Sequence, residues 1–175
     1  MDLQISHSKN RLTPVAALGR LLDEMEALLI GMDPETYCGR FAPGVSGSIG
    51  EHVRHCLDHI SALLTADPAA TLSYDRRHRG TAVETDASAA IRQIVESRRV
   101  LDSWGRRLLD EPIRVCSLIA ASGESVTGWS TLGRELAFVM SHTIHHQALI
   151  AVLLAIRGHG VPDRFGYAPS TPRPN

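Results

Sequence analysis

The pattern of apolar and polar positions along the chain divides it into four segments with the period of an amphipathic helix. The first segment begins at Thr13-Pro14, a capping residue followed by proline at the first helical position. Its apolar residues then recur at intervals of three and four: Val15, Leu18, Leu22, Met25 and Leu29. Gly31 and Asp33-Pro34 predict the end of this helix.

The second segment begins at Ser48 with the sequence of a capping box. Ser48 and Glu51 can each accept a hydrogen bond from the backbone amide of the other. The apolar stripe that follows consists of Ile49, Val53, Cys56, Ile60, Leu63 and Leu64. This helix is expected to end near Asp67-Pro68.

Two further helices are predicted in the second half of the chain. The third begins at Thr85 or Asp86 and reaches about Asp110, where Pro112 stops it. The fourth begins at Ser130 or Thr131 and ends at Gly158, a suitable C-terminal glycine. One face of the fourth helix, with the histidines on its core side, is expected to carry Leu132, Glu135, Phe138, Val139, His142, His146, Leu149 and Leu153.

The connections differ in character. Two β-prone runs, 113–119 and 125–129, flank Ser122-Gly123, which predicts a small hairpin or an extended cross-connection before the last helix. The stretch "YDRRHRGT", 74–81, is charged and turn-prone. It is either a solvated loop or a loop whose arginines bind an anionic substrate: Arg76, Arg77 and Arg79.

Four helices without a strong sheet signal predict an all-α fold, a helical bundle in one domain. That domain spans 1–175, with a core at about 10–160 and an extended C-terminal tail.

Composition narrows the function. A formal net charge of −1 argues against a nucleic-acid surface, which needs a strong basic excess. The three cysteines form no CxxC pair, so neither a disulfide framework nor a zinc ribbon is expected. The N-terminus has no signal-peptide pattern, and the apolar runs fall short of a membrane span, so we expect a cytoplasmic protein that does not bind membranes.

Histidine is the unusual feature of the composition. Six of the nine histidines fall in two clusters: His52, His55 and His59, then His142, His145 and His146. His142 and His146 are four residues apart, so on a helix they project from one face and can reach one metal ion, whereas His145 is rotated away. Taken alone, this pair is as consistent with hydrogen-bonded or pocket-lining histidines as with metal ligands.

The second predicted helix offers a third imidazole. His52, His55 and His59 lie on neighbouring rows beside its apolar stripe, with His52 and His59 closer to the core face than His55. Three histidines from two facing helices leave one coordination position open, which is the pattern of a catalytic metal site.

With these two histidine clusters and four helices, the sequence resembles the DinB/YfiT-like superfamily of metalloenzymes. "SIGEHVRHCLDHI", 48–60, is similar to the second helix of that family, with Ser48, His55 and Asp58 at the family positions. "MSHTIHHQALIAVLLAIRG", 140–158, is similar to its last helix. The resemblance covers most of residues 10–160.

The resemblance implies a four-helix bundle that binds zinc or nickel through His55, His142 and His146, with water completing the shell. From the helix pattern, His59, one turn on from His55, is the reserve ligand. It also implies a homodimer and, by similarity to characterised members, chemistry that uses a low-molecular-weight thiol on a small-molecule substrate.

Other residues are secondary candidates. Asp58 either orients His55 or is an exposed carboxylate, and Glu135 is either a general base or the partner of an arginine. Cys56 is expected to be a buried core cysteine, and Trp104 and Trp129 are expected to serve in packing rather than as substrate platforms.

Three functions therefore compete. The first is a metal-dependent thiol transferase or hydrolase. The second is a protein that binds a metal or small ligand without turnover, such as a sensor. The third is a helical interaction module in which the histidines are structural.

Overall fold

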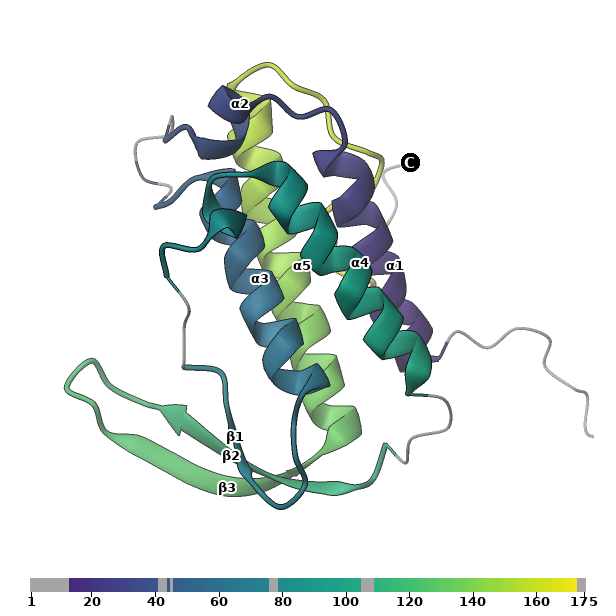
Figure 1. The fold of residues 1–175 in the computed structure, drawn as a ribbon, viewed down its shortest axis with the longest axis vertical. Coiled ribbons are helices and arrows are strands. Elements are labelled where there is room, and N and C mark those ends of the chain that lie inside the picture. The colour runs from purple at the N-terminus through teal and green to yellow at the C-terminus, as the bar shows by residue number, and fades with distance from the viewer. Residues whose placement is uncertain (1–12, 41–43, 45, 76–78, 105–108, 173–175) are drawn as a thin grey trace, which may run out of the picture.

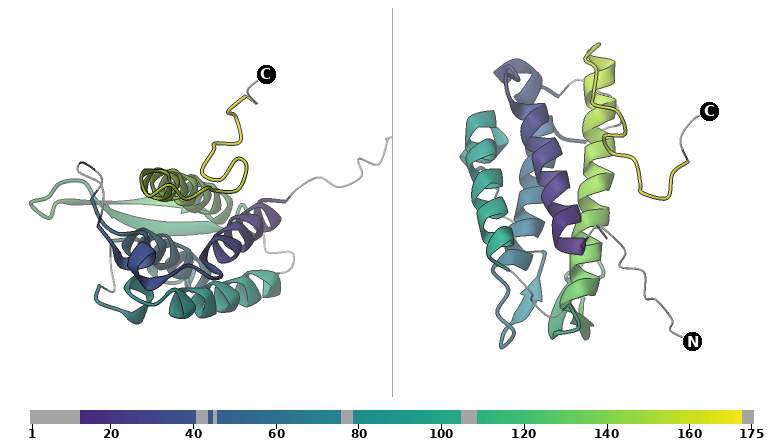
Figure 2. Two further views of the ribbon diagram at one scale, coloured as in Figure 1. Left: turned by 90° about the horizontal axis from the view of Figure 1, so that it is seen from above. Right: turned by 90° about the vertical axis from the view of Figure 1, so that its right-hand side faces the viewer.

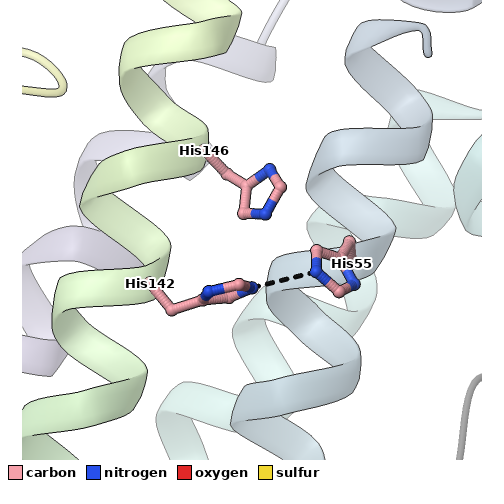
Figure 3. Close-up of side chains that lie close together, drawn as sticks. All are labelled: His55, His142 and His146. Carbon is pink, nitrogen blue, oxygen red and sulfur yellow. Dashed lines mark hydrogen bonds between the residues drawn. The ribbon is translucent and has the colours of Figure 1, made fainter. Parts of the chain in front are cut away.

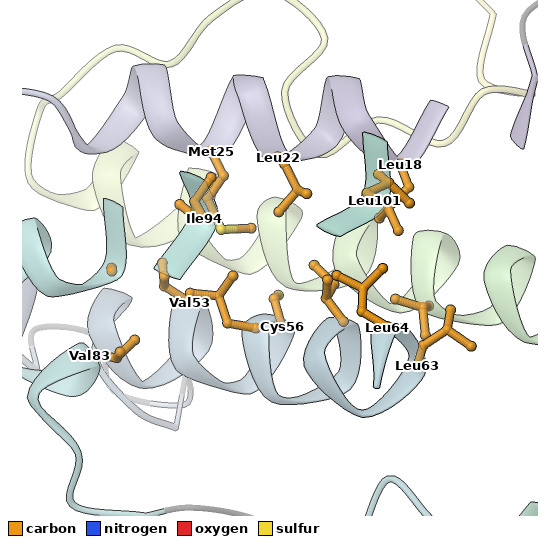
Figure 4. Close-up of a cluster of buried hydrophobic side chains, with 14 of the residues drawn as sticks. Leu18, Leu22, Met25, Val53, Cys56, Leu63, Leu64, Val83, Ile94 and Leu101 are labelled. Carbon is orange, nitrogen blue, oxygen red and sulfur yellow. The ribbon is translucent and has the colours of Figure 1, made fainter. Parts of the chain in front are cut away.

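The protein was analysed as a computed structural model, which describes residues 13–40, 44, 46–75, 79–104 and 109–172. Four long helices make up most of the fold (Figure 1): α1 (Pro14–Leu29), α3 (Ile49–Leu64), α4 (Ala87–Ser103) and α5 (Leu132–Ile156). Helix α3 packs against α4 and α5, and α1 packs against the same two helices. Their apolar stripes meet in one core, which includes Leu18, Leu22, Met25, Val53, Cys56, Leu63, Ile94 and Leu101 (Figure 4).

The local signals for helix starts are confirmed. The Thr13 side chain accepts a hydrogen bond from the backbone amide of Ala16 at the start of α1. Both hydrogen bonds of the capping box between Ser48 and Glu51 are present at the start of α3. Thr131 caps α5 in the same way as Thr13 caps α1.

Helix α4 ends at Ser103, earlier than the predicted end near Asp110. Gly105 follows in the sequence and is a poor helix former. Further on, the carbonyl oxygen of Leu109 accepts a hydrogen bond of 2.6 Å from the amide of Gly133. The backbone at Leu109 is thus paired with the start of α5.

A three-stranded sheet lies across one end of the helices, in the order β1-β2-β3. Strand β2 (Pro112–Leu118) pairs antiparallel with β3 (Ser125–Thr131), which confirms the predicted hairpin. Strand β1 (Thr71–Ser73) pairs parallel with β2 and was not predicted. The fold is therefore mostly helical with a small sheet, and the all-α prediction is too narrow.

The hairpin extends beyond the helices (Figure 1). Paired residues on adjacent strands point to the same side of a sheet. Ile113 and Val115 lie on the side toward the helices, where Ile113 is buried, and Arg114 and its partner Trp129 lie on the outer side. Trp129 is 73% exposed, so the prediction that it serves in packing is wrong.

Two short helices, α2 (Pro34–Cys38) and the 3-10 helix η1 (Ala82–Glu84), were also not predicted. The Asp33 side chain accepts a hydrogen bond from the amide of Thr36 and so caps α2. Asp33-Pro34, which marks the end of one helix in the sequence, is thus also the start of another. The Tyr37 hydroxyl donates to the carbonyl oxygen of Val83 at 2.6 Å and ties α2 to η1.

Helix α5 is long and apolar enough, by those two criteria alone, to cross a membrane, and the mean hydropathy of its most apolar window is 1.4. The expectation that no apolar stretch reaches that length is therefore wrong. Core helices meet the same two criteria, and α5 packs against α1 and α3.

The described part of the C-terminal tail folds back along α5 (Figure 2). Phe165 is buried in the core. Gly166 has a φ of +76° and approaches α5 so closely that a Cβ there would lie 2.5 Å from the amide nitrogen of Ala148. Glycine is the residue that permits both this φ and this approach.

Candidate metal centre

Helices α3 and α5 lie side by side and bring histidines from both clusters together (Figure 3). The candidate ligand nitrogens of His55, His142 and His146 all lie within 4.8 Å of one another, and each residue is half-buried. The Nε2 atoms of His55 and His142 are 2.9 Å apart. Two residues one turn apart on α5 and one residue on α3 thus form a compact group of imidazoles, which we call the histidine triad.

The donor set of the triad fits a divalent metal. Zinc binds histidine nitrogen at roughly 2.0–2.1 Å, so two nitrogens on one ion lie at most about 4.2 Å apart. The separation of 2.9 Å between His55 and His142 is inside that limit. The whole triad spans up to 4.8 Å, slightly more than this limit.

The triad lies at the edge of the core, and this corrects the predicted face of α5. The residues that are fully buried on this helix are Leu136, Val139, Thr143, Gln147 and Ile150. The Thr143 hydroxyl donates to the carbonyl oxygen of Val139 at 2.8 Å, and the Gln147 side-chain nitrogen donates to that of Leu21 at 3.3 Å. The Gln147 side-chain oxygen is buried and has no hydrogen-bond partner among the described residues. His142 and His146 are consequently placed beside the core, and both are half-buried.

Burial is the main cause that lowers the pKa of His146, to about 3, and the charge of the nearby His142 adds to it. A histidine with so low a pKa is neutral at physiological pH, which is the form that binds metals. The Nδ1 atoms of His146 and His52 are 2.9 Å apart. One of the two nitrogens must donate to the other, and this contact fixes the orientation of the His146 ring.

The shift of His146 predicts how stability depends on pH in the metal-free protein. Between pH 6.5 and about 3, the unfolded chain binds a proton at this residue that the folded chain does not bind. The free energy of unfolding should therefore decrease as the pH falls through this window. The pKa of His52 is lowered by burial too, and acts in the same direction.

This pH dependence can be measured by urea unfolding of chelator-treated protein at about pH 7 and about pH 5. We expect lower stability at the lower pH, and a smaller loss in His146→Gln, which has no proton to bind at that position. An equal loss in both proteins would show that His146 is not the group responsible.

The other two histidines of α3 contact the triad: His52 contacts His146, and His59 contacts His142. His52 and His59 are buried, and both are more buried than His55, as the apolar stripe predicted. His59 Nδ1 donates to the carbonyl oxygen of His55 at 3.0 Å. Its ring stacks on His142, with 4.2 Å between centroids, and on Tyr74 at 5.2 Å. His59 is therefore placed to hold the His142 ring in position.

The sequence model of the family described as the DinB superfamily matches residues 17–150. The chain belongs to the DinB superfamily. A second similarity is to a protein named FK506-binding protein 5 from Rhizopus delemar, with 34% identity over 115 residues. That match covers 65% of this chain and 30% of the fungal protein, so the chain spans less than a third of its relative's length.

Asp58 of this DinB-superfamily chain has a partner other than the one predicted. Its carboxylate forms an ion pair with Arg54 on the preceding turn of α3. Arg54 Nε also lies 2.6 Å from the Glu84 carboxylate of η1. Asp58 therefore takes part in a mostly buried charge network that joins α3 to η1.

Glu135 lies seven residues before His142, which is two turns or roughly 10 Å along α5. Only 3% of it is exposed. Its carboxylate accepts hydrogen bonds from the Ser130 hydroxyl at 2.6 Å and the Tyr74 hydroxyl at 3.0 Å, and pairs with Arg134 at 3.4 Å. The arginine partner considered from sequence is thus present.

Tyr74 and Phe138 join Glu135 to the triad, and sequence reasoning assigned neither of them a role. The Phe138 ring lies 5.8 Å from that of His142. Burial, and next the Glu135 carboxylate, raise the pKa of Tyr74, so its hydroxyl stays protonated and serves as a donor. Phe138 was visible on the apolar stripe of α5, but Tyr74 lies in the charged connection and had no signal of its own.

The remaining candidate residues differ in exposure. Arg79 is exposed, whereas Arg76 and Arg77 lie outside the described residues. Burial raises the pKa of Cys56 to about 12, and this residue and Trp104 are buried, as predicted. His145 is exposed, which agrees with its predicted place away from the pair.

Proposed function

We propose that the protein is a metal-dependent enzyme in which His55, His142 and His146 hold one divalent ion, within a four-helix bundle of the DinB type. The observation that carries this proposal is the approach of three half-buried imidazoles from two helices to within 4.8 Å. The family supports the same reading, because the match covers both helices over the positions of the triad.

The chemistry we propose is thiol-dependent transfer or hydrolysis on a small molecule. A divalent ion with three neutral ligands supplies a nucleophile at neutral pH, since it lowers the pKa of a bound water or thiol. His52 and His59 would orient the rings of His146 and His142, and Tyr74 would hold His59 from its other side. Zinc and nickel both suit imidazole donors.

The alternative is a metal-binding or small-ligand-binding protein without turnover. The name of the fungal relative describes binding, although this chain spans only 30% of that protein. The homodimer, the cytoplasmic location and the low-molecular-weight thiol remain predictions from the sequence.

A turnover assay separates these two functions. Zinc- or nickel-loaded protein is incubated with cysteine or glutathione and 1-chloro-2,4-dinitrobenzene, and separately with 4-nitrophenyl acetate. We expect one of the two reactions to be accelerated, the acceleration to be lost on chelation, and His145→Ala to retain it. Loaded protein that accelerates neither reaction would refute the enzymatic proposal in favour of binding.

A further inference from the structure

A pocket of about 330 Å³ lies between the β2–β3 hairpin and the first turns of α5. The inner side of the hairpin forms its floor, where Val115 pairs with Gly128 and Ser117 pairs with Val126. Arg134, Glu135 and Phe138 of α5, together with Tyr74, form the opposite side. A volume of this size accommodates a small molecule.

The floor of this pocket is open because of Gly128. A Cβ built on this residue meets no atom within 4 Å, and its φ lies outside the left-handed region. Glycine is unfavourable in the interior of a strand, and it marks sites where another group approaches the backbone closely. Val126, on the same side of the sheet, is 54% exposed, so an apolar surface is available beside the open position.

The wall opposite the floor presents a guanidinium group over an aromatic ring. Arg134 Cζ lies 5.4 Å from the centroid of Phe138, which holds the planar group against the ring. One nitrogen of Arg134 pairs with the Glu135 carboxylate at the longer distance of 3.4 Å. The carboxylate also accepts shorter bonds from Ser130 and Tyr74, so the other N–H groups of Arg134 can serve a bound anion.

The pocket adjoins the histidine triad through two shared side chains. Phe138 contacts His142, with 5.8 Å between ring centroids, and Tyr74 stacks on His59 at 5.2 Å. A molecule seated on the hairpin therefore lies next to the rings that face the triad.

We propose that this pocket binds the substrate of the histidine centre, and that the substrate is a small organic carboxylate with a short apolar body. The apolar body would lie on Val115, Gly128 and Val126, and the carboxylate would bind the fork of Arg134. Glu135 also lines the pocket, but its carboxylate already accepts hydrogen bonds from Ser130 and Tyr74 and pairs with Arg134. A ligand with a single negative charge matches the single guanidinium of Arg134. The role of the pocket as a substrate site rests on the proposed function, whereas its affinity for carboxylates does not.

The test uses 3-phenylpropanoate and its neutral analogue 3-phenylpropanamide as probes, in calorimetric titrations of metal-loaded and chelator-treated protein. We expect the carboxylate to bind about tenfold more tightly than the amide in both preparations, as for a charge-assisted hydrogen bond. Arg134→Gln should remove this preference. Gly128→Val should weaken both probes at least about tenfold by filling the floor.

Arg114→Gln is the matched control, because Arg114 is not among the residues that line the pocket. Its side chain lies on the outer side of the same hairpin, 5.8 Å from the ring of Trp129, which does line the pocket. It should leave both affinities unchanged. Thermal melts of all variants check that each is folded. Equal affinity for the two probes, or no effect of Arg134→Gln and Gly128→Val in folded protein, would overturn the proposal.

The titrations also separate this proposal from the proposed function. Carboxylate binding that disappears on chelation would mean that the probe binds the ion itself, which supports the metal centre and refutes the pocket. Carboxylate binding that depends on Arg134 in a protein that never binds metal would support the pocket as a carboxylate site and refute the proposed function.

Discussion

His142→Ala should abolish tight metal binding. His142 is the central member of the triad, since its Nε2 lies 2.9 Å from that of His55 and it shares one face of α5 with His146. Loss of a residue that only orients a ligand typically lowers metal affinity 10–100-fold, so loss of a ligand should exceed about 100-fold. The dissociation constants can be measured by competition with a chromophoric chelator.

Two companion variants make this result specific. His145→Ala removes an imidazole from the exposed side of the same helix and should change the affinity little. His52→Ala removes the contact to His146 and should weaken binding by an intermediate amount, about 10–100-fold. Equal losses for His142→Ala and His145→Ala would mean that the cluster binds metal without the predicted triad.

The second large effect is expected at Gly50→Ala, where α3 meets the short helices. A Cβ at this position would lie 2.1 Å from the carbonyl oxygen of Glu84 and 2.7 Å from Cε1 of Tyr37. Neither group can move freely, because Tyr37 donates a hydrogen bond to Val83 and the Glu84 side chain pairs with Arg54. We expect the free energy of unfolding to fall by about 3 kcal/mol, at the upper end of the usual cost of overpacking.

Gly128→Ala is the matched control, since its Cβ would meet nothing within 4 Å. Its stability should change by less than about 1 kcal/mol and, in a strand, should rise rather than fall. Urea unfolding of both variants measures the difference. A Gly50→Ala protein as stable as the native one would contradict the close packing of α3 against η1.

The helices could be predicted because their signals are local. Thr13-Pro14, the Ser48–Glu51 pair and Thr131 each lie within a turn of the hydrogen bonds that they make. The strand β1 could not be predicted in the same way, because three residues in a polar connection become a strand only by pairing with β2. Helix α2 does have a local signal, the Asp33-Pro34 cap, but the same dipeptide also marks the end of α1, and the five-residue helix is tied to η1 by the contact of Tyr37 with Val83.

For the site, too, the part that depends on one helix could be predicted, and the part that depends on how two helices pack could not. Helical period alone identifies His142 and His146 as a pair and separates His145 from them. The choice among His52, His55 and His59 depends on where α3 faces α5, and the apolar stripe favours the two more buried residues. Thr143 and Gln147 occupy the buried face of α5, so His142 and His146 lie at the edge of the core. There they meet the half-buried His55 of α3.

The most direct test of the metal centre is a crystal structure of zinc- or nickel-reconstituted protein, with anomalous scattering measured at the absorption edge of the metal. We predict one peak within bonding distance of a nitrogen from each of His55, His142 and His146, with the remaining position filled by a molecule from solvent. A peak bound by His52 or His59 in place of His55, or no peak near these helices in fully reconstituted protein, would contradict this assignment.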